Sequence, residues 1–495
     1  MAVVLLVILC FTTLLCVRKW SKLTQYYRTF NLLERFSGPP AYLLIGTVPY
    51  MLFTDFYKWA NAMCQQYGDP VRFWRFGHPM IFISSYKYAV QLLTKSNFNG
   101  KLQDLDMIYR HPGGKGLSTM QADIHSQKRK MLAPAFSRAI VEGSVEAFSE
   151  ETKILLNTLQ KFAVTGDAFN MVDYMMTCLF HMVARSDFGD TFMENRNDNT
   201  ARQHMQALHT IAETLSKRIL GPNLLLRKDF IFFLTKDGKA TRKAGNTLNS
   251  FALQAVEKRR LYRKTVTGEH NICYLDILLD LMDSGLMNED DVISELNNFM
   301  GGAYDTTALT ICWTLFLLAL NPQHQEKVYE ELQHIFKSLP SSSSSEYTLT
   351  ANDTKEMKYL ELCLKESLRL FPPAPIFPRS TVTDMKLDDG RIIPGKVDVL
   401  IFANLIHRDP EYFPNPEKFD PERHLEPIPA FMPFSMGVRN CIGQVYGMYQ
   451  SKVVLAYLIR EFVWETTESW ESVEIAYQGL LYPKNGLHFK IKRRC

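Results

Sequence analysis

Apolar residues recur at three-to-four-residue intervals through much of this 495-residue chain, a spacing that is typical of amphipathic helices. The pattern is strongest from Asp291 to Leu320, between the acidic turn Glu289-Asp290-Asp291 and the stop signal Asn321-Pro322. About thirty residues at 1.5 Å each predict one helix of roughly 45 Å. Short β-like runs occur at Pro79–Ile83 and Val397–Ile401. The pattern therefore predicts a mainly α fold with a small β portion.

The N-terminal residues follow another pattern. Ala2 to Val17 is an uncharged, apolar run, and Arg18, Lys19 and Lys22 follow it. A membrane-spanning helix needs ~20 residues, with ~17 at the short end, so a cleaved signal peptide is the competing interpretation. Because the basic residues stand after the run and no A-x-A-like site follows, we expect a retained membrane anchor over residues 1–18. The positive-inside rule then places the rest of the chain in the cytosol.

The rest of the chain shows no clear boundary between domains. Gly38-Pro39-Pro40 interrupts any helix, because proline lacks the amide donor. We therefore expect residues 19–40 to form a basic, proline-rich hinge. The serine run Ser341–Ser345 is too short for a linker between domains. One catalytic domain over residues 41–495 is the prediction.

Composition and charge narrow the choice of partners. Hydrophobic residues make up 46% of the chain, which is ample for a large core. The formal charge of +4 and the lack of a long basic block disfavour nucleic acid as a partner. The nine cysteines are odd in number and never in a C-x-x-C spacing, which disfavours a zinc site and favours a reducing compartment.

The clearest chemical signal surrounds Cys441. Glycines on both sides of this cysteine allow a tight loop whose backbone amides approach the sulfur and stabilise a thiolate. The alternative is a buried cysteine in a glycine-rich turn. The surrounding residues resemble the cysteine loop of the cytochrome P-450 superfamily, F-x-x-G-x-R-x-C-x-G, at every fixed position: Phe434, Gly437, Arg439, Cys441 and Gly443.

The resemblance implies the cytochrome P-450 fold, a single large domain with the long helix over the haem. Its cofactor would be haem b, with Cys441 as the axial ligand of the iron. Four residues are implied to contact the haem propionates: Arg439, Arg129, Arg379 and His125. His125 stands where the family carries a tryptophan, and a solvent-facing histidine is the alternative. The run Lys128-Arg129-Lys130 is a candidate contact for an acidic reductase, with a solvated helix face as the alternative.

On the long helix, Gly302–Thr307 resembles the family's oxygen-activating segment. Thr306 is implied to hydrogen-bond the activated oxygen, and Asp305 to relay protons. An Asp-Thr-Thr turn within a packed helix is the alternative. Ala303 stands where the family pattern usually has glycine. Gly302 stands where many members carry a glutamate that esterifies a haem methyl, so no covalent glutamate ester is expected.

A second charged motif lies downstream of this helix. Glu366 and Arg369 share one helix face at i, i+3, which on its own describes a common surface ion pair. In the superfamily such a pair joins the arginine of a P-E-R segment, here Pro421-Glu422-Arg423. The implied role of Glu366, Arg369 and Arg423 is structural, on the proximal side of the haem. His424 takes the place of an aromatic residue.

Within the superfamily, Arg218 to Leu234 and the wording Arg-Asn-Cys-Ile-Gly look most like family four and its insect relatives. The implied enzyme is a monooxygenase that inserts one oxygen atom from O2 into a lipophilic substrate: a fatty-acid-like lipid, hormone, odorant or xenobiotic. NADPH-cytochrome P-450 reductase would supply electrons, with cytochrome b5 as a second candidate donor. The implied location is the endoplasmic reticulum membrane, with a single N-terminal anchor and the catalytic domain facing the cytosol.

Substrate contacts are expected by position in five segments: Phe98–Thr119, Leu208–Leu234, Asn298–Thr306, Pro373–Phe377 and Leu480–Leu481. The apolar residues Leu224–Leu226 and Phe230–Leu234 are also candidates for dipping into the membrane.

Two other functions stay open. One is a degenerate haem protein that carries or senses lipophiles without turnover, which the departures His125, Ala303 and His424 favour. The other is a peroxide-using haem-thiolate isomerase or dehydratase, which Thr306 disfavours because such members tend to lose this threonine. The sequence has no H-E-x-x-H, G-x-S-x-G or G-K-[ST] motif, which disfavours a zinc enzyme, a hydrolase or a P-loop enzyme.

Overall fold

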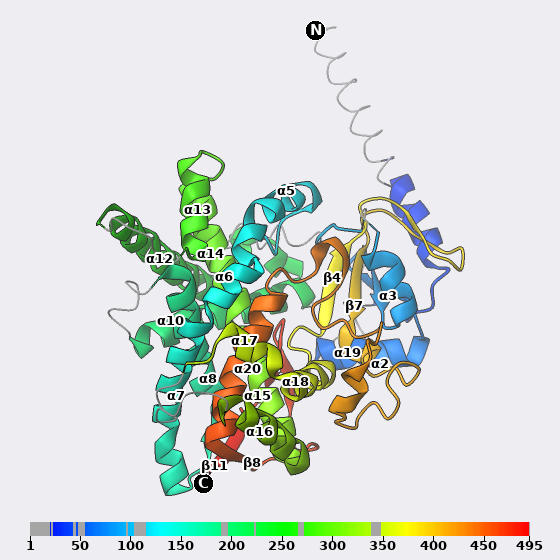
Figure 1. Ribbon diagram of the computed structural model, residues 1–495. Helices are drawn as coiled ribbons and strands as arrows, with labels where there is room; N and C mark the ends of the chain where they lie inside the picture. The colour runs from blue at the N-terminus through cyan, green and yellow to red at the C-terminus, as the bar shows by residue number, and fades with distance from the viewer. Residues whose placement is uncertain are drawn as a thin grey trace. The chain divides into compact units, whose positions relative to one another are not determined.

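The computed structural model describes residues 20, 23–42, 46–47, 55–95, 98–102, 115–189, 197–221, 224–265, 272–337 and 348–494. The expected anchor over residues 1–18 lies outside them, and residues 23–33 of the expected hinge are helical. The chain divides into two compact units, Met1–Gln103 with Pro378–Phe402, and Asp104–Phe377 with Ala403–Cys495. Helices dominate and strands are a minor part, as predicted (Figure 1).

The first unit contains a four-stranded sheet with the order β1-β2-β7-β4. β1 (Val71–Arg75) pairs antiparallel with β2 (His78–Ile83), and β2 pairs in parallel with β7 (Asp398–Phe402). Both runs predicted as strands therefore lie in this sheet, side by side. The unit's other elements are α2 (Phe56–Tyr67), α3 (Tyr86–Leu93), β5 (Met385–Lys386) and β6 (Ile392–Ile393), while β4 (Ile376–Ser380) crosses the unit's boundary at Pro378.

The second unit is mainly helical. Its longer helices are α5 (Ala122–Leu132), α7 (Val145–Thr165), α8 (Met171–Phe188), α10 (Asp198–Leu220), α12 (Lys236–Thr265), α13 (Tyr274–Asp283), α14 (Glu289–Ala303), α15 (Asp305–Leu320), α16 (Pro322–Lys337), α18 (Lys358–Leu370) and α20 (Gln444–Glu461). Short helical pieces are η3 (Ala133–Phe136), α6 (Arg138–Gly143), η4 (Leu224–Arg227), α11 (Asp229–Phe232), α17 (Ala351–Glu356), α19 (Ala403–Ile406), η5 (Pro421–Leu425) and η6 (Gly437–Arg439). A three-stranded sheet joins β3 (Phe169–Asn170), β11 (His488–Arg493) and β8 (Phe462–Thr466), and β9 (Ile475–Tyr477) pairs with β10 (Leu481–Pro483).

α15 forms the centre of this unit and packs against α8, α18 and α20 (Figure 1). Its residues from Thr307 to Leu318 are all buried, and Trp313 stacks on Phe371 with ring centroids 4.1 Å apart. The stretch Glu289–Leu320 is long and apolar enough to cross a membrane, but 78% of its most apolar window is buried within the protein. A helix that is apolar on all faces belongs in a core when protein covers it.

The predicted long helix is divided in two at Tyr304, where α14 ends and α15 begins. Thr306 Oγ1 donates to the Gly302 carbonyl at 2.8 Å, and Thr307 Oγ1 donates to the Ala303 carbonyl at 3.0 Å. Hydroxyls that bond back to the preceding turn compete with the backbone ladder and bend helices. The prediction of one uninterrupted helix is therefore corrected, and the break falls inside the segment that resembles the oxygen-activating sequence.

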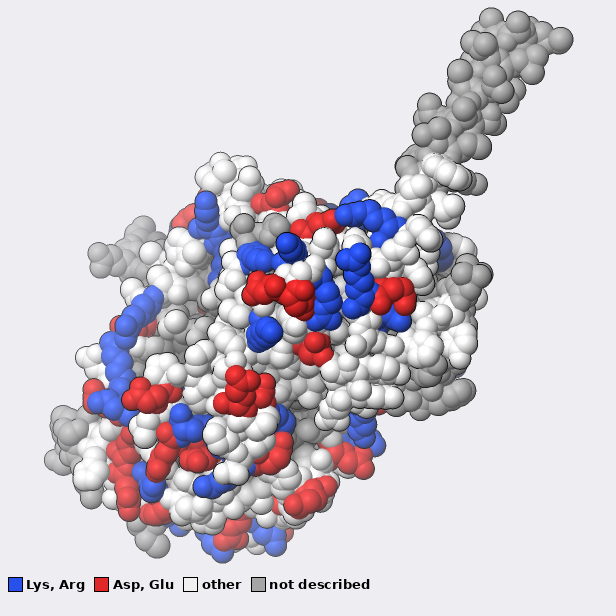
Figure 2. All heavy atoms as spheres, turned by 90° about the vertical axis from the view of Figure 1, so that its right-hand side faces the viewer, with Lys and Arg blue, Asp and Glu red and all other residues white. Residues whose placement is uncertain are grey.

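Surface charge adds little to the fold. On the face that Figure 2 shows, basic and acidic side chains are interspersed. Surface ion pairs such as Lys327–Glu422 at 2.8 Å and Lys484–Glu474 at 2.7 Å add little to stability, because solvent screens them. The stability of the fold therefore rests on the buried core around α15.

Candidate functional site

The loop before Cys441 is closed by its own backbone. The Cys441 amide donates to the Phe434 carbonyl at 2.9 Å, and the Asn440 amide donates to the Gly437 carbonyl at 3.1 Å. Gly437 adopts a φ of 73°, a left-handed conformation that favours glycine over any side chain. The glycine in the motif is thus needed for the tight turn that presents Cys441.

Cys441 differs from the other cysteines in its exposure. Among the cysteines that the structure describes, Cys441 is exposed, and the rest are buried: Cys64, Cys178, Cys273, Cys312 and Cys363. The recess around its sulfur raises the pKa of the thiol by desolvation, while the Gly443 amide and the Arg129 charge lower it. An accessible sulfur beside a cation and a backbone donor is suited to bind a metal as thiolate.

Two of the predicted propionate ligands border this loop. Arg129 on α5 donates from Nη1 to the Asn440 carbonyl and from Nη2 to Asn440 Oδ1, both at 2.7 Å. Arg439 donates from Nη2 to the Met120 carbonyl at 2.7 Å. The two guanidinium groups therefore join the cysteine loop to α5 and the segment before it. Their contact with propionates stays a prediction.

The other two predicted propionate ligands are also buried. His125 lies one turn before Arg129 on α5 and is 5% exposed, so the solvent-facing alternative is wrong. Arg379 is 4% exposed and donates from Nη1 to the Pro378 carbonyl at 3.0 Å. Arg379 belongs to the first unit, whereas Cys441 belongs to the second.

The basic run on α5 is not an exposed patch. The Lys128 side chain is 9% exposed, and its Nζ lies 3.0 Å from Glu295 and 3.5 Å from Asp291 on α14. Glu295 is itself buried and needs a cation to offset its desolvation. The prediction that this run faces a reductase is therefore wrong for Lys128, which forms an ion pair inside the protein. Lys130 is exposed.

The junction of α14 and α15 carries a carboxyl and a hydroxyl on consecutive residues, Asp305 and Thr306, which we call the acid–alcohol turn. Gly302 is exposed, and a Cβ built on it would meet nothing within 4 Å, so open space adjoins this turn. Asp305 follows Tyr304 at the start of α15, and its Oδ2 accepts from the Tyr482 hydroxyl at 3.1 Å. Burial raises the pKa of Asp305 to about 7, although the Tyr482 hydrogen bond lowers it in part. The carboxyl can therefore gain or lose a proton near neutral pH.

This junction lies against the helix that follows the cysteine loop. A Cβ built on Gly447 of α20 would stand 3.6 Å from Thr307 Oγ1 of α15. Gly447 comes six residues after Cys441. The cysteine loop and the acid–alcohol turn thus belong to one neighbourhood of the second unit.

Several of the expected substrate segments meet here as well. The Leu481 amide donates to the Pro373 carbonyl at 2.8 Å, which joins two of them. A Cβ on Gly301 would stand 3.3 Å from Leu208 Cδ1, which joins two more. Residues 103–114 of the expected segment Phe98–Thr119 and residues 222–223 of the expected segment Leu208–Leu234 lie outside the described residues.

A cluster of cations surrounds Glu366, as the motif predicts. Arg369 donates from Nε to Oε2 and from Nη2 to Oε1, both at 2.8 Å, and Arg423 donates from Nε to Oε1 at 3.0 Å. His424 Nε2 lies 2.9 Å from Oε2 and acts as a further donor. Burial alone would raise the pKa of Glu366, but the Arg369 and His424 hydrogen bonds hold it at about 2. His424 therefore replaces the aromatic residue with a hydrogen bond to the cluster.

His407 links this cluster to the cysteine loop and was not predicted from sequence. Its carbonyl accepts from Arg369 Nη1 at 2.9 Å, and its Nε2 accepts from the Met432 amide at 3.0 Å. Burial lowers the pKa of His407 to about 3, which keeps the ring neutral and Nε2 free to accept. Phe431 lies against both histidine rings, with centroids 4.6 Å from His424 and 5.6 Å from His407. An isolated histidine carries no spacing signal that could have indicated this role.

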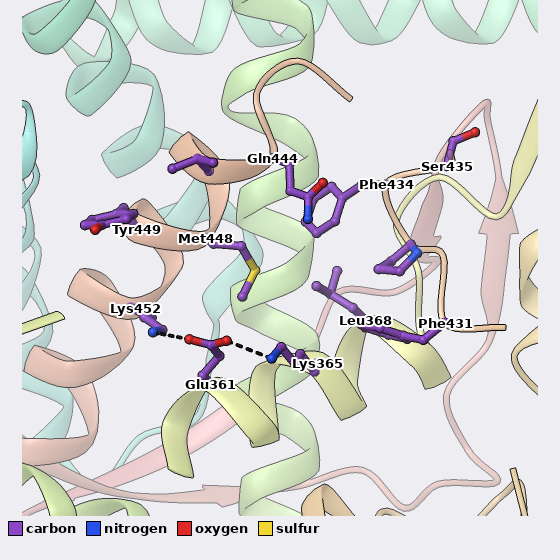
Figure 3. Close-up of a pocket in the computed structure, with 12 residues that line it drawn as sticks. Glu361, Lys365, Leu368, Phe431, Phe434, Ser435, Gln444, Met448, Tyr449 and Lys452 are labelled. Atoms are coloured by element: carbon purple, nitrogen blue, oxygen red, sulfur yellow. Dashed lines mark hydrogen bonds and ion pairs between the residues drawn. The ribbon is translucent and has the colours of Figure 1, made fainter. Parts of the chain in front are cut away.

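A pocket of about 390 Å³ opens behind the cysteine loop (Figure 3). Glu361 lies between Lys365, at 2.7 Å, and Lys452 on one side of it. Apolar side chains form much of the remaining lining, together with the loop residue Phe434: Leu368, Phe431, Pro433, Val445 and Met448. Ser435, Gln444 and Tyr449 add polar groups to it.

Comparisons with known proteins agree with this geometry. The family Cytochrome P450 matches residues 37–491. Cytochrome P450 4c3 of Drosophila melanogaster is 29% identical over 96% of this chain and 91% of its own length. Cytochrome P450 4c21 of Blattella germanica is 31% identical over 94% of both chains, and Cytochrome P450 4V2 of Homo sapiens is 31% identical over 84% of this chain and 81% of its own.

The residues present suit haem b, the cofactor of that family. Cys441 offers an accessible sulfur to the iron. Arg129 and Arg439 place positive charge at the cysteine loop, which would balance propionates. Gly302 leaves open space by the acid–alcohol turn and supplies no carboxyl for an ester.

Proposed function

The chain belongs to the cytochrome P450 family and is a haem-thiolate monooxygenase, and we propose that it inserts one oxygen atom from O2 into a lipophilic substrate. A fatty-acid-like lipid, hormone, odorant or xenobiotic fits this class. When bound, haem supplies oxygen activation and electron transfer. The described residues supply the ligand, the proton path and the positioning.

The proximal residues hold the sulfur. The hydrogen bond between the Cys441 amide and the Phe434 carbonyl fixes the loop, and the Gly443 amide and Arg129 favour the thiolate. Arg129, Arg439, His125 and Arg379 are proposed to bind the propionates, and Glu366, Arg369 and Arg423 to brace the loop from behind.

The residues at the junction of α14 and α15 are proposed to transfer protons. Asp305 is proposed to exchange protons with solvent, and Thr306 to present its hydroxyl to the activated oxygen. Thr306 Oγ1 donates to the Gly302 carbonyl, which leaves its oxygen lone pairs available to accept. This acid–alcohol pair beside open space is the observation that carries the proposal, since a carrier has no need of a carboxyl that titrates near pH 7.

The proposed electron donor is NADPH-cytochrome P-450 reductase, with cytochrome b5 as a second donor. The pocket behind the cysteine loop is its proposed docking region, because Phe434 both lines the pocket and bonds to Cys441 through its carbonyl. The proposed location is the endoplasmic reticulum membrane, with residues 1–18 as the anchor, residues 19–40 as the hinge and residues 41–495 as a cytosolic catalytic domain.

Turnover separates this function from its alternatives. Full-length haem-loaded protein is mixed with reductase, NADPH and a panel of lipophiles, and product, NADPH and peroxide are measured. NADPH-dependent oxygenated product supports the proposal. Ligand-induced spectra without NADPH-dependent product would indicate a carrier, and rearranged product from added peroxide alone would indicate an isomerase.

The Thr306→Ala variant tests the distal assignment in the same assay. It should keep its haem but divert most reducing equivalents to peroxide, because the hydroxyl is lost. Thr310→Ala is the matched control, since Thr310 lies one turn further along α15 and bonds to the Thr306 carbonyl. Equal coupling in both variants would contradict the assignment.

A further inference from the structure

We propose that Tyr482 is a positioning residue for Asp305, the proton-relay carboxyl at the start of α15. The Tyr482 hydroxyl holds this carboxyl in place, so proton delivery depends on the position of the β9–β10 hairpin. This inference rests on the proposed role of Asp305. The two residues are 177 positions apart in the chain, and the Tyr482 hydroxyl donates to Asp305 Oδ2 at 3.1 Å.

The Asp305 carboxyl has few hydrogen-bonding or charged partners among the described residues. Among the described residues, no lysine or arginine forms an ion pair with Asp305, and Tyr482 is the side chain that bonds it. A buried carboxylate usually takes a cation or several donors. A single neutral donor leaves Asp305 able to change its charge while keeping its orientation.

The hairpin gives Tyr482 a fixed place. β10 pairs antiparallel with β9, with Tyr482 opposite Ala476. The preceding residue, Leu481, donates its amide to the Pro373 carbonyl at 2.8 Å. Leu480 and Leu481 form one of the segments expected to contact substrate, so Tyr482 follows it directly in sequence. A shift of this hairpin on substrate binding would reach Asp305 through one hydrogen bond.

Tyr482 acts as a donor that keeps its own proton. Burial and the charge of Asp305 raise the pKa of Tyr482 well above its ordinary value, so the transferred proton belongs to Asp305. Among the residues that the structure describes, other titratable groups nearby include Tyr304, whose hydroxyl lies 3.4 Å from His204 Nδ1, and His209, whose ring centroid lies 6.0 Å from that of Tyr482. Burial raises the pKa of Tyr304 and lowers that of His204 to about 3, so both stay neutral.

The test is Tyr482→Phe in the full-length holoenzyme with reductase. Haem content and the reduced carbon monoxide spectrum should stay unchanged, and KM should change less than twofold. Product formed per NADPH should fall several-fold, and the solvent deuterium isotope effect should rise. The pH midpoint of coupling should move upward, because the lost hydrogen bond favours the ionised carboxyl. Tyr477→Phe, on the paired strand β9, is the matched control and should leave all four quantities as in the wild type.

The Asp305→Asn variant and the double variant separate the inference from the function it rests on. Asp305→Asn should lower coupling by itself, and adding Tyr482→Phe should cause no further loss. If Asp305→Asn lowers coupling while Tyr482→Phe keeps the wild-type coupling and pH midpoint, the inference on Tyr482 is overturned and the proposed function stands. If Asp305→Asn couples normally, the proton-relay role is overturned. Additive losses in the double variant would also contradict the inference, because they require Tyr482 to act independently of Asp305.

Discussion

Glu366 on α18 and Asp305 on α15 are both carboxyl groups whose pKa burial raises, but they differ in what surrounds them. Glu366 accepts hydrogen bonds from Arg369, Arg423 and His424, and those from Arg369 and His424 bring its pKa to about 2. Asp305 accepts one hydrogen bond from Tyr482, and its pKa stays at about 7.

The difference fits the roles proposed for these residues, Glu366 as a structural acid and Asp305 as a proton carrier. A carboxylate with several cationic donors keeps its charge at every physiological pH, so it can only hold groups in place. A carboxyl with one neutral donor changes its charge near pH 7, which suits it to acid–base chemistry. The number and charge of the donors, rather than the burial, decide the role.

Removing the charge of Glu366 should have the largest effect on stability. Glu366→Gln leaves the buried Arg369 and the partly buried Arg423 without their carboxylate, and breaking such a buried pair costs about 3–5 kcal/mol. Glu422→Gln is the matched control in the segment that carries Arg423, because that carboxyl and its partner Lys327 are both about half exposed; its loss should leave the free energy of unfolding close to that of the wild type. Urea unfolding followed by circular dichroism measures both. Similar losses in the two variants would remove the distinction between the sites.

The pH dependence of Asp305 should be the next largest effect. A carboxyl whose folded pKa is raised binds more protons in the native state, so its stabilising contribution is lost as pH rises towards about 7. The Asp305→Asn variant lacks this titration. As pH rises from 5 to 7, its free energy of unfolding relative to that of the wild type should therefore increase by up to about 1 kcal/mol per pH unit, and then level off. Glu366 stays ionised in this window, since its pKa is about 2. Urea unfolding at several pH values checks the slope. A flat or opposite slope would show that Asp305 is ionised throughout.

Replacing His424 with the family's aromatic residue should have the smallest effect. His424→Phe keeps a ring against Phe431 but loses the hydrogen bond to Glu366, which is a loss of about 1.5 kcal/mol for a bond to a charged acceptor. His324→Phe on α16 is the control, because it loses a bond to the neutral hydroxyl of Tyr359 and should cost about 0.5–1 kcal/mol. Thermal unfolding of both variants provides the comparison. A more stable His424→Phe would show that the histidine is a departure without structural use.

Much of this site could be predicted from local sequence. The cysteine loop depends on a turn within ten residues, and Gly437 reports the left-handed backbone that the turn needs. The Glu366–Arg369 pair follows from helical spacing, and β2 and β7 follow from short apolar runs. These features are local, so their residue pattern carries the information.

The rest depends on contacts between distant segments. The Tyr482–Asp305 and His407–Met432 hydrogen bonds join residues that no spacing rule relates. Lys128 looked like part of a basic surface, yet the buried Glu295 on α14 draws it inside. The sequence did not predict the break at Tyr304, because the apolar pattern continues across it. The hydroxyls of Thr306 and Thr307, which bond to carbonyls of the preceding turn, bend the backbone there.

The central claim is that Cys441 ligates the haem iron, and the difference spectrum of the dithionite-reduced, carbon monoxide-bound protein tests it most directly. A thiolate opposite carbon monoxide shifts the Soret band far to the red of histidine-ligated haem, and the wild type should show this shifted band while Cys441→Ala should lack it. A histidine-type spectrum from folded, haem-loaded wild-type protein would contradict the claim, and the monooxygenase mechanism built on the cysteine loop would fall with it.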